Sequence, residues 1–272
     1  PSTLACTHAP ADALCDDGVG CTVDACDPTA GCTSTPDDTA CGGSGCGPGA
    51  CDPLLDCQPS DGSVLVFNGG GGSTAPEDAV ASLGYTPIVV VDEISFVAAF
   101  DAGGFDAIVF DVPSVFSPVP AAVQTRLDTW VNAGERLIFG FWDLDADAAM
   151  AGTLDVAVSA SFDAPLPIHP DPASPVDLFG MPETITPPIV YPDNWSDNGD
   201  QLVLDGPGFT AARFTDPVAG PGAILVTHGD RVVTNGFIIS EIGETAVDSD
   251  ADGVNDGVEL LRNELTLVCS AP

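Results

Sequence analysis

Acidic residues recur with a fixed spacing in one short stretch near the end of the sequence. The run D-S-D-A-D-G-V-N-D-G-V-E occupies residues 248–259, with acids at its positions 1, 3, 5, 9 and 12. A hard divalent cation takes six to eight oxygen ligands, and glycine at position 6 permits the sharp turn that brings them together. The spacing predicts a calcium loop. Its expected ligands are Asp248, Asp250, Asp252, the carbonyl oxygen of Val254, Asp256 and Glu259.

This run resembles an EF-hand loop, and more closely the single D-x-D-x-D-G-V loops of dockerins and thrombospondin type-three repeats. It differs from a paired EF-hand at position 8, where Asn255 stands in place of an apolar residue. The preceding stretch, G-F-I-I-S-E-I-G at 236–243, has the pattern of a strand rather than a helix. We therefore expect a lone loop followed by a helix over 258–267. The alternative is a solvated acidic linker.

The net charge limits the partners that the chain can have. The 272 residues include 41 acidic and 5 basic side chains, all five of them arginine, for a formal charge of -36. Nucleic acids and anionic membrane surfaces require cationic side chains, so both are excluded as partners. No apolar run reaches the roughly 18 residues of a membrane span. Self-repulsion at this charge destabilises a compact state, and divalent cations counteract it.

Ten cysteines point to disulfides rather than to a zinc site. Nine lie between Cys6 and Cys57, none is spaced as C-x-x-C, and A-C-D-P occurs at both 25–28 and 50–53. The intervals between successive cysteines repeat as 8, 5, 4, 5 and then 8, 4, 4, 5 residues, which indicates a tandem duplication of about 26 residues. Disulfides form in oxidising surroundings, so we expect a secreted protein at the cell surface or outside the cell.

The first copy, C-D-D-G-V-G-C-T-V-D-A-C-D-P-T-A-G-C, resembles the short C-T-x-D-x-C repeat of slime-mould extracellular matrix proteins, which implies an extracellular setting. With four cysteines in each copy, Cys57 is left over, and Cys269 is the one cysteine outside the module. We predict a disulfide between Cys57 and Cys269. Cys6 is the next candidate partner for Cys269, and a bond between two chains is the third.

From residue 63 onwards the pattern changes to apolar strands that alternate with helices. Continuous apolar runs of the kind buried on both faces stand at 64–67, 88–91, 107–110 and 137–141, with helical spacing at 75–84, 93–100 and 119–134 between them. Such alternation predicts a parallel sheet with helices on both sides. A strand at 154–160, a proline-rich excursion at 165–192 and a hairpin turning at 228–230 complete the expected elements.

With F-D-A-I-V-F-D at 105–111 and G-D-R-V-V-T-N-G-F at 229–237, this part is similar to the flavodoxin-like fold of class I glutamine amidotransferase-like domains. That resemblance implies a nucleophilic cysteine after a strand, with a histidine and a glutamate downstream. The α/β part has no cysteine, and His8, His169 and His228 have no local partners. We therefore expect the flavodoxin-like fold of this family without its amidotransferase activity.

Three acids end predicted strands, namely Asp92, Asp111 and Asp143, and the run D-L-D-A-D extends the last of them through Asp145 and Asp147. Ligands of α/β folds bind at this edge of the sheet, so a second divalent site is one interpretation. The simpler interpretation, which we favour, is helix capping by solvated acids.

These features predict an α/β, flavodoxin-like domain with two additions. We assign a disulfide-rich module to 1–60, the α/β domain to 61–246, and the calcium loop and helix to 247–272. The function we expect is a calcium-stabilised, non-catalytic structural or adhesive protein outside the cell, whose partners are copies of itself in a filament or surface layer, or an extracellular carbohydrate or protein. The alternative is a secreted metal-dependent hydrolase or carbohydrate-active accessory protein that uses the strand-edge acids.

Overall fold

The computed structural model divides the chain into two compact units, Pro1–Gly62 and Ser63–Pro272. The segment 247–272, which the sequence analysis assigned separately, lies within the second unit. The structure describes residues 15–27, 31–37, 40, 46, 49–52, 56–59, 62–69, 73–113, 115, 117–180, 182–193 and 199–271. Within those ranges, no helix is both long and apolar enough to cross a membrane.

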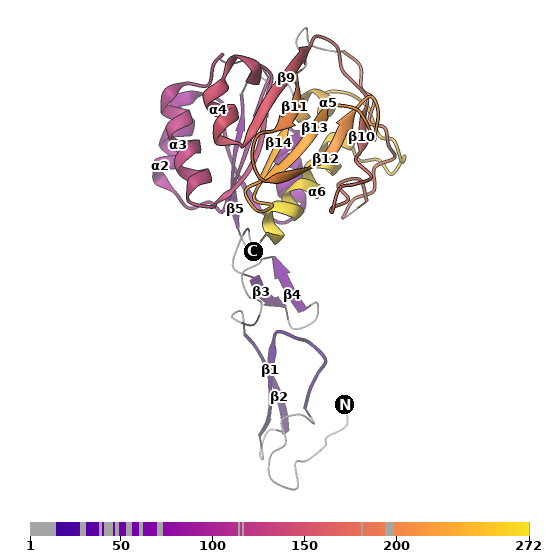
Figure 1. Ribbon diagram of the computed structural model, residues 1–272. Coiled ribbons are helices and arrows are strands. Elements are labelled where there is room, and N and C mark those ends of the chain that lie inside the picture. Colours follow the sequence, from indigo (N-terminus) through magenta and orange to yellow (C-terminus); the bar gives the residue numbers. More distant parts are fainter. Residues whose placement is uncertain are drawn as a thin grey trace. The chain divides into compact units, whose positions relative to one another are not determined.

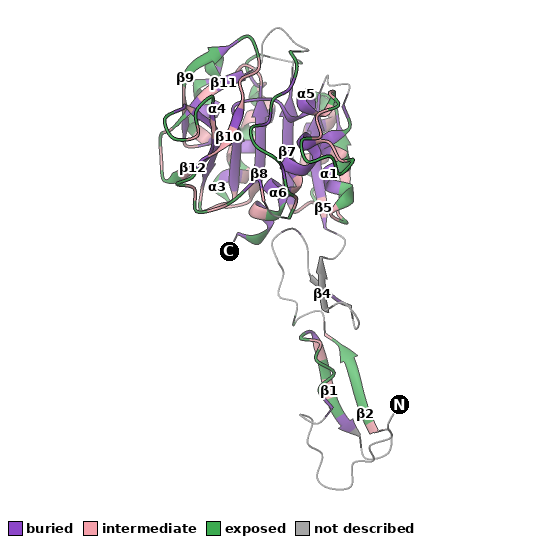
Figure 2. Cartoon of the chain, turned by 90° about the vertical axis from the view of Figure 1, so that its right-hand side faces the viewer, coloured by how far each residue is buried: buried purple, intermediate pink, exposed green. Residues whose placement is uncertain are grey.

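The first unit contains two antiparallel hairpins that reflect the sequence repeat. Strands β1 (Thr22–Asp27) and β2 (Gly31–Pro36) form one hairpin, and β3 (Gly49–Asp52) and β4 (Asp56–Pro59) form the other. Cys26 pairs in register with Cys32, and Cys51 pairs with Cys57, so the repeated A-C-D residues at 25–27 and 50–52 occupy equivalent positions in the two hairpins. Strand β2 is mostly exposed (Figure 2), because this short segment has few apolar residues to bury.

Disulfides join the two copies of the repeat to each other. The bonds Cys15–Cys32 and Cys21–Cys51 each link a cysteine of the first copy to one of the second. Cys269 is also in a disulfide. The side chain of Cys57, which we predicted as its partner, lies outside the described residues, so that pairing stays a prediction.

Five parallel strands form the centre of the second unit in the order β6-β5-β7-β8-β14. Within this unit, the second strand, β6, lies outside the first, β5. The strands β7, β8 and β14 follow on the opposite side of β5, which is the flavodoxin-like order. This fold was predicted from the alternation of strands and helices. The bounds are β5 Ser63–Asn68, β6 Thr86–Val90, β7 Ala107–Val112, β8 Arg136–Phe141 and β14 Val232–Asn235.

Antiparallel strands extend this sheet beyond β14. β13 (Gly222–Thr227) and β14 form a hairpin whose turn, His228–Asp230, has positive φ at all three residues. On the far side of β13 lie β12 (Gly208–Phe214) and β10 (Ile168–Pro170), while β11 (Gly199–Leu204) pairs with both β13 and β9 (Val156–Phe162). The hairpin turn falls where the sequence predicted it.

Helices cover both faces of the parallel strands (Figure 1). On one face pack α2 (Glu93–Ala102), α3 (Ala121–Asn132), the short η3 (Leu144–Ala146) and α4 (Ala148–Thr153). On the other face pack α1 (Ala75–Ser82), α5 (Ile239–Gly243) and α6 (Asp256–Ser270). Phe110 stacks between Phe67 and Phe139 at centroid distances of 5.0 and 5.1 Å, beneath α2 and α3.

Two expectations about local structure were wrong. The stretch 236–243 was expected to be a strand, but residues 239–243 form helix α5. Residues 237–239 and 242 are fully buried, and a short apolar run that is buried on all sides has no periodicity that separates strand from helix. β6 was expected to be buried on both faces, yet it is an edge strand and Val89 is 44% exposed.

Candidate metal site

The acidic loop turns back on itself between α5 and α6. Gly253 has φ +97° and Ala251 has φ +64°, and these two left-handed residues curl the chain around its own carboxylates. The backbone N–H of Asp252 donates to Asp248 and Asp250, both at 3.2 Å, and the N–H of Gly253 donates to Asp248 at 3.0 Å. Carboxylate oxygens of Asp248, Asp250 and Asp252 consequently lie within 4.8 Å of one another, as the sequence spacing implied.

Glu259 lies in the first turn of α6, and its carboxylate faces the same loop. The residue has no exposed surface, and neither of its carboxylate oxygens has a hydrogen-bond partner. One oxygen lies within 4.8 Å of carboxylate oxygens of Asp252 and Glu183. A buried carboxylate without a partner is costly, and the cost disappears when a cation lies against it. The geometry therefore fits the group that the sequence predicts.

Glu183 is a member of the site that sequence reasoning missed. It belongs to the proline-rich excursion, 76 residues before Glu259 in the sequence, and no motif surrounds it. The side chain of Asn263 on α6 places it, because Oδ1 accepts from the N–H of Glu183 at 2.8 Å and Nδ2 donates to its carbonyl at 2.9 Å. Arg262 forms an ion pair with the Glu183 carboxylate at 3.0 Å.

Crowding of like charges perturbs this site. Burial, followed by the charges of Asp250, Asp252, Asp256 and Glu183, raises the pKa of Glu259 to about 8. Burial also raises the pKa of Asp256, although a hydrogen bond from Ser249 acts in the opposite direction. Both shifts describe the loop without a bound cation, whose charge would reverse them.

Two predicted ligands stand apart from these groups of carboxylates. Asp256 is fully buried at the start of α6, where one oxygen accepts from the N–H of Ser249 at 2.8 Å and the other has no partner. The N–H of Val254 donates to Asp252 at 2.7 Å. The carbonyl oxygen of Val254 remains a predicted ligand. So does the carboxylate of Asp256, at position 9 of the loop.

A second polar cluster lies at the carboxyl ends of the parallel strands. Asn68, Asp111, Gly140 and Asn235 stand side by side in register on β5, β7, β8 and β14. Asp111 accepts hydrogen bonds from the N–H groups of Ile239 and Ser240, at 3.1 and 2.9 Å, and from the Ser240 hydroxyl. It therefore holds the start of α5 on the sheet. Burial raises the pKa of Asp111 to about 6.

Glu264 of α6 contacts the same row of residues at the strand ends. Its Oε2 accepts from Asn235 Nδ2 at 3.1 Å, its Oε1 has no partner, and the residue is fully buried. Burial, with a smaller contribution from the charge of Asp111, raises the pKa of Glu264 to about 8. No sequence pattern indicates this residue as a site, because glutamate in an amphipathic helix is ordinarily exposed.

The strand-end acids have structural roles. Asp92 caps α2 by accepting from the N–H of Ser95 at 2.8 Å, and Asp147 caps α4 by accepting from the N–H of Met150 at 3.0 Å. Asp143 bonds to the hydroxyl of Ser117. Burial and the neighbouring Asp143 raise the pKa of Asp145. Within the described ranges, Asp92, Asp111 and Asp143 do not form a group that could share one cation.

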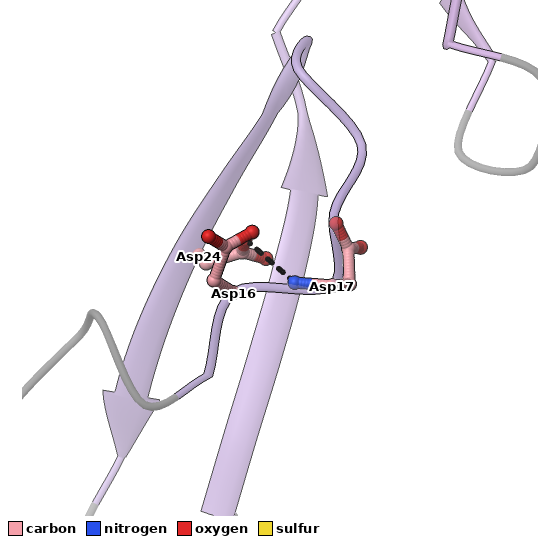
Figure 3. Close-up of side chains that lie close together, drawn as sticks. All are labelled: Asp16, Asp17 and Asp24. Atoms are coloured by element: carbon pink, nitrogen blue, oxygen red, sulfur yellow. Dashed lines mark hydrogen bonds between the residues drawn. The ribbon is translucent and has the colours of Figure 1, made fainter.

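Another acidic cluster lies in the first unit (Figure 3). Asp16, Asp17 and Asp24 have carboxylate oxygens within 4.8 Å of one another. Asp24 accepts from the N–H of Asp17 at 3.1 Å, and Asp17 accepts from the hydroxyl of Ser34, which lowers the pKa of Asp17. Asp16 and Asp17 are exposed and Asp24 is half-buried, and the second carboxylate oxygen of Asp24 is buried without a hydrogen-bond partner.

No protein-family model and no curated protein matches this chain. Solved structures do match it. A candidate GMP synthase subunit from Thermoplasma acidophilum superposes with a TM-score of 0.50 at 12% identity, over 77% of this chain and 94% of that one. A glutamine amidotransferase from Thermotoga maritima gives 0.47 at 10% identity, over 77% and 99%. One from Methylobacillus flagellatus gives 0.46 at 11% identity, over 77% and 92%.

The second unit thus shares a flavodoxin-like fold with the GMP synthase subunit, and this fold class was predicted from the sequence. At 12% identity the likeness shows the fold alone. The nucleophile that the family resemblance implies has no counterpart here, since the sequence has no cysteine between Cys57 and Cys269. His228 lies in the β13–β14 turn, 3.1 Å from the carbonyl oxygen of Thr153 and 3.4 Å from Asp155.

Proposed function

We propose that this chain is a non-catalytic, calcium-stabilised structural or adhesive protein that works outside the cell. The observation that carries the proposal is Glu259. Its carboxylate is fully enclosed, has no hydrogen-bond partner at either oxygen, and lies against other carboxylates. Only a cation or a proton relieves such an arrangement, and the loop that surrounds it has the ligand spacing of a calcium site.

The composition supports an extracellular location. Disulfide-bonded cysteines fit an oxidising compartment, and a chain with 41 acidic and 5 basic residues gains stability where divalent cations are abundant. Calcium-rich extracellular fluid would both fill a calcium site and counteract the negative charge of the chain.

The absence of the family's nucleophile from the sequence supports a non-catalytic role. The neighbours in fold are named as glutamine amidotransferases and as part of a GMP synthase, which are enzymes. In this chain the row at the strand ends is buried and occupied by structural hydrogen bonds to Asp111. We therefore propose that the α/β domain is a rigid body that presents surfaces, and that its partner is a second copy of the chain in a filament or surface layer.

Calcium titration of the whole purified chain tests the metal site. We expect isothermal titration calorimetry to find one calcium per chain, and thermal unfolding to shift upward when calcium replaces a chelator. The double variant Asp248→Asn/Asp250→Asn should lose both effects. Asp16→Asn/Asp17→Asn, which removes the same charge from the first unit, should retain them. A wild-type chain that neither binds calcium nor gains stability from it would overturn the proposed site.

Electron microscopy of the same preparation tests the assembly. Filaments or sheets that form with calcium and dissolve with a chelator are the expected result, since head-to-tail contacts that do not close give open assemblies. Monodisperse single chains under both conditions would contradict self-assembly and leave the calcium site to be judged by calorimetry.

A further inference from the structure

The proline-rich excursion contacts the acidic loop through Glu183 and Thr186. It contains β10 and ends before β11, and its residues 178–180 and 182–186, here called the docking segment, lie against α6 and the loop. Leu178, Phe179 and Ile185 of this segment are buried, and Asn263 of α6 also donates to the carbonyl of Leu178 at 2.9 Å. The N–H of Thr186 donates to the hydroxyl of Ser249, inside the loop, at 2.9 Å.

These contacts place a third carboxylate from outside the loop beside two loop carboxylates. Oxygens of Glu183, Asp252 and Glu259 lie within 4.8 Å of one another. Carboxylates at that separation repel one another when ionised, and Glu259 is fully enclosed with both oxygens unpartnered. Arg262 offsets this repulsion on one side only, through its ion pair with Glu183.

We propose that Glu183 is a ligand of the bound calcium ion, and that the ion changes the contact between the docking segment and the loop from repulsive to attractive. This inference rests on the proposed calcium site and adds to it a ligand that no loop pattern contains. Calcium accepts up to eight oxygens in flexible geometry, so one more carboxylate can be accommodated beside the loop ligands.

The consequence is that calcium stabilises the excursion as well as the loop. With the ion bound, the docking segment is held by its buried apolar side chains, by Asn263 and by a carboxylate–metal bond. Without the ion, the apolar contacts and the Asn263 hydrogen bonds must hold the segment against repulsion between the carboxylates. The amides of Glu183 and Thr186 should therefore exchange with solvent more slowly when calcium is present, because local opening of the segment would break the metal contact.

The test compares Glu183→Gln with a matched control, Glu93→Gln, which removes a carboxylate from the exposed start of α2. Loss of a ligand should weaken calcium binding at least as much as loss of an outer-shell partner does, about 10- to 100-fold. The control should bind like the wild type. Hydrogen-exchange mass spectrometry should show calcium-dependent protection of peptides from 178–189 in the wild type and the control, and none in Glu183→Gln.

Arg262→Gln supplies an independent variant in case Glu183→Gln folds poorly. Removing the cation that competes for Glu183 should tighten calcium binding, and should do so less when combined with Glu183→Gln, because the two residues then no longer interact. If the wild type binds calcium while Glu183→Gln binds as tightly as the control, the role of Glu183 is wrong and the loop site stands. If the wild type binds no calcium, both proposals fail.

Discussion

Two glutamates on α6 are equally buried but have different neighbours. Glu259 and Glu264 have no exposed surface, and burial raises the pKa of each to about 8. Glu259 faces the acidic loop with two unpartnered oxygens, whereas Glu264 faces the strand-end row and accepts a hydrogen bond from Asn235. Burial alone therefore does not distinguish a cation ligand from a protonated acid.

The surroundings make that distinction. Glu259 shares its site with carboxylates from the loop and from the docking segment, so several negative charges meet where one divalent ion can neutralise them. Glu264 is in no such group of three within the described part of the chain, and a single proton suffices to neutralise it. We expect calcium at the first glutamate and a proton at the second.

The largest expected effect comes from Glu259→Gln. Calcium affinity should fall on the order of 100-fold or more, because an amide cannot replace a bidentate carboxylate. In a chelator the same variant should be more stable than the wild type by about 1–3 kcal/mol, since glutamine is neutral and does not have to take up a proton to be buried, as Glu259 does. Calorimetry and urea unfolding measure the two changes. A Glu259→Gln variant that is less stable than the wild type in chelator, or that binds calcium normally, would contradict the assignment of Glu259 as a calcium ligand.

Glu264→Gln should change the pH dependence of stability and leave calcium binding intact. Because the folded pKa of about 8 lies above the ordinary value of 4.5, the wild type loses stability as the pH rises from about 4.5 to about 8. The glutamine variant lacks this loss, so it should match the wild type near pH 4 and exceed it by several kcal/mol at pH 9. Urea unfolding across that range measures the difference, and parallel profiles would contradict a protonated Glu264.

Asn255→Ala should affect the Glu259 end of α6 more than the Glu264 end. The Asn255 side chain caps the helix by accepting from the N–H of Gly257 at 2.9 Å, and it donates to the carbonyls of Ile242 and Thr245. We expect a loss of about 1–2 kcal/mol in stability and weaker calcium binding. The pH-dependent difference caused by Glu264 should persist, and its disappearance would show that the two ends of the helix are coupled.

Ala251→Gly should give the smallest effect. Ala251 has φ +64°, a conformation that glycine adopts without steric cost, although glycine also gives the unfolded chain more freedom. We expect the two terms to leave a net stabilisation of about 0.5 kcal/mol or less, equal with calcium and with chelator. A stabilisation seen only with calcium would show that the loop takes this conformation only around the ion.

The elements of the second unit were largely predictable because their signals are local. Continuous apolar runs marked β5, β7 and β8, and glycine or asparagine marked the ends of α2 and α3. The loop acids were predictable for the same reason, since carboxylates two residues apart converge without help from the rest of the fold. The start of α6 was placed two residues late, because Asn255 was judged as a loop position and not as a helix cap.

What could not be predicted depends on contacts between distant parts of the chain. Glu183 meets the loop only because Asn263 and buried apolar residues hold the excursion against α6. Glu264 is buried only because α6 packs over the carboxyl end of β14. Helix α5 was taken for a strand because its apolar residues face neighbours on every side. None of these contacts leaves a periodic pattern in the sequence.

The two disulfides described in the first unit overlap along the chain, since Cys15–Cys32 closes one ring and Cys21–Cys51 closes another that begins inside the first. A protease that cuts once between Cys15 and Cys21 leaves the pieces joined by the first bond. A single cut between Cys32 and Cys51 leaves them joined by the second, and a cut between Cys21 and Cys32 leaves both intact. A single cut anywhere between Cys15 and Cys51 therefore leaves the first unit in one covalently joined piece.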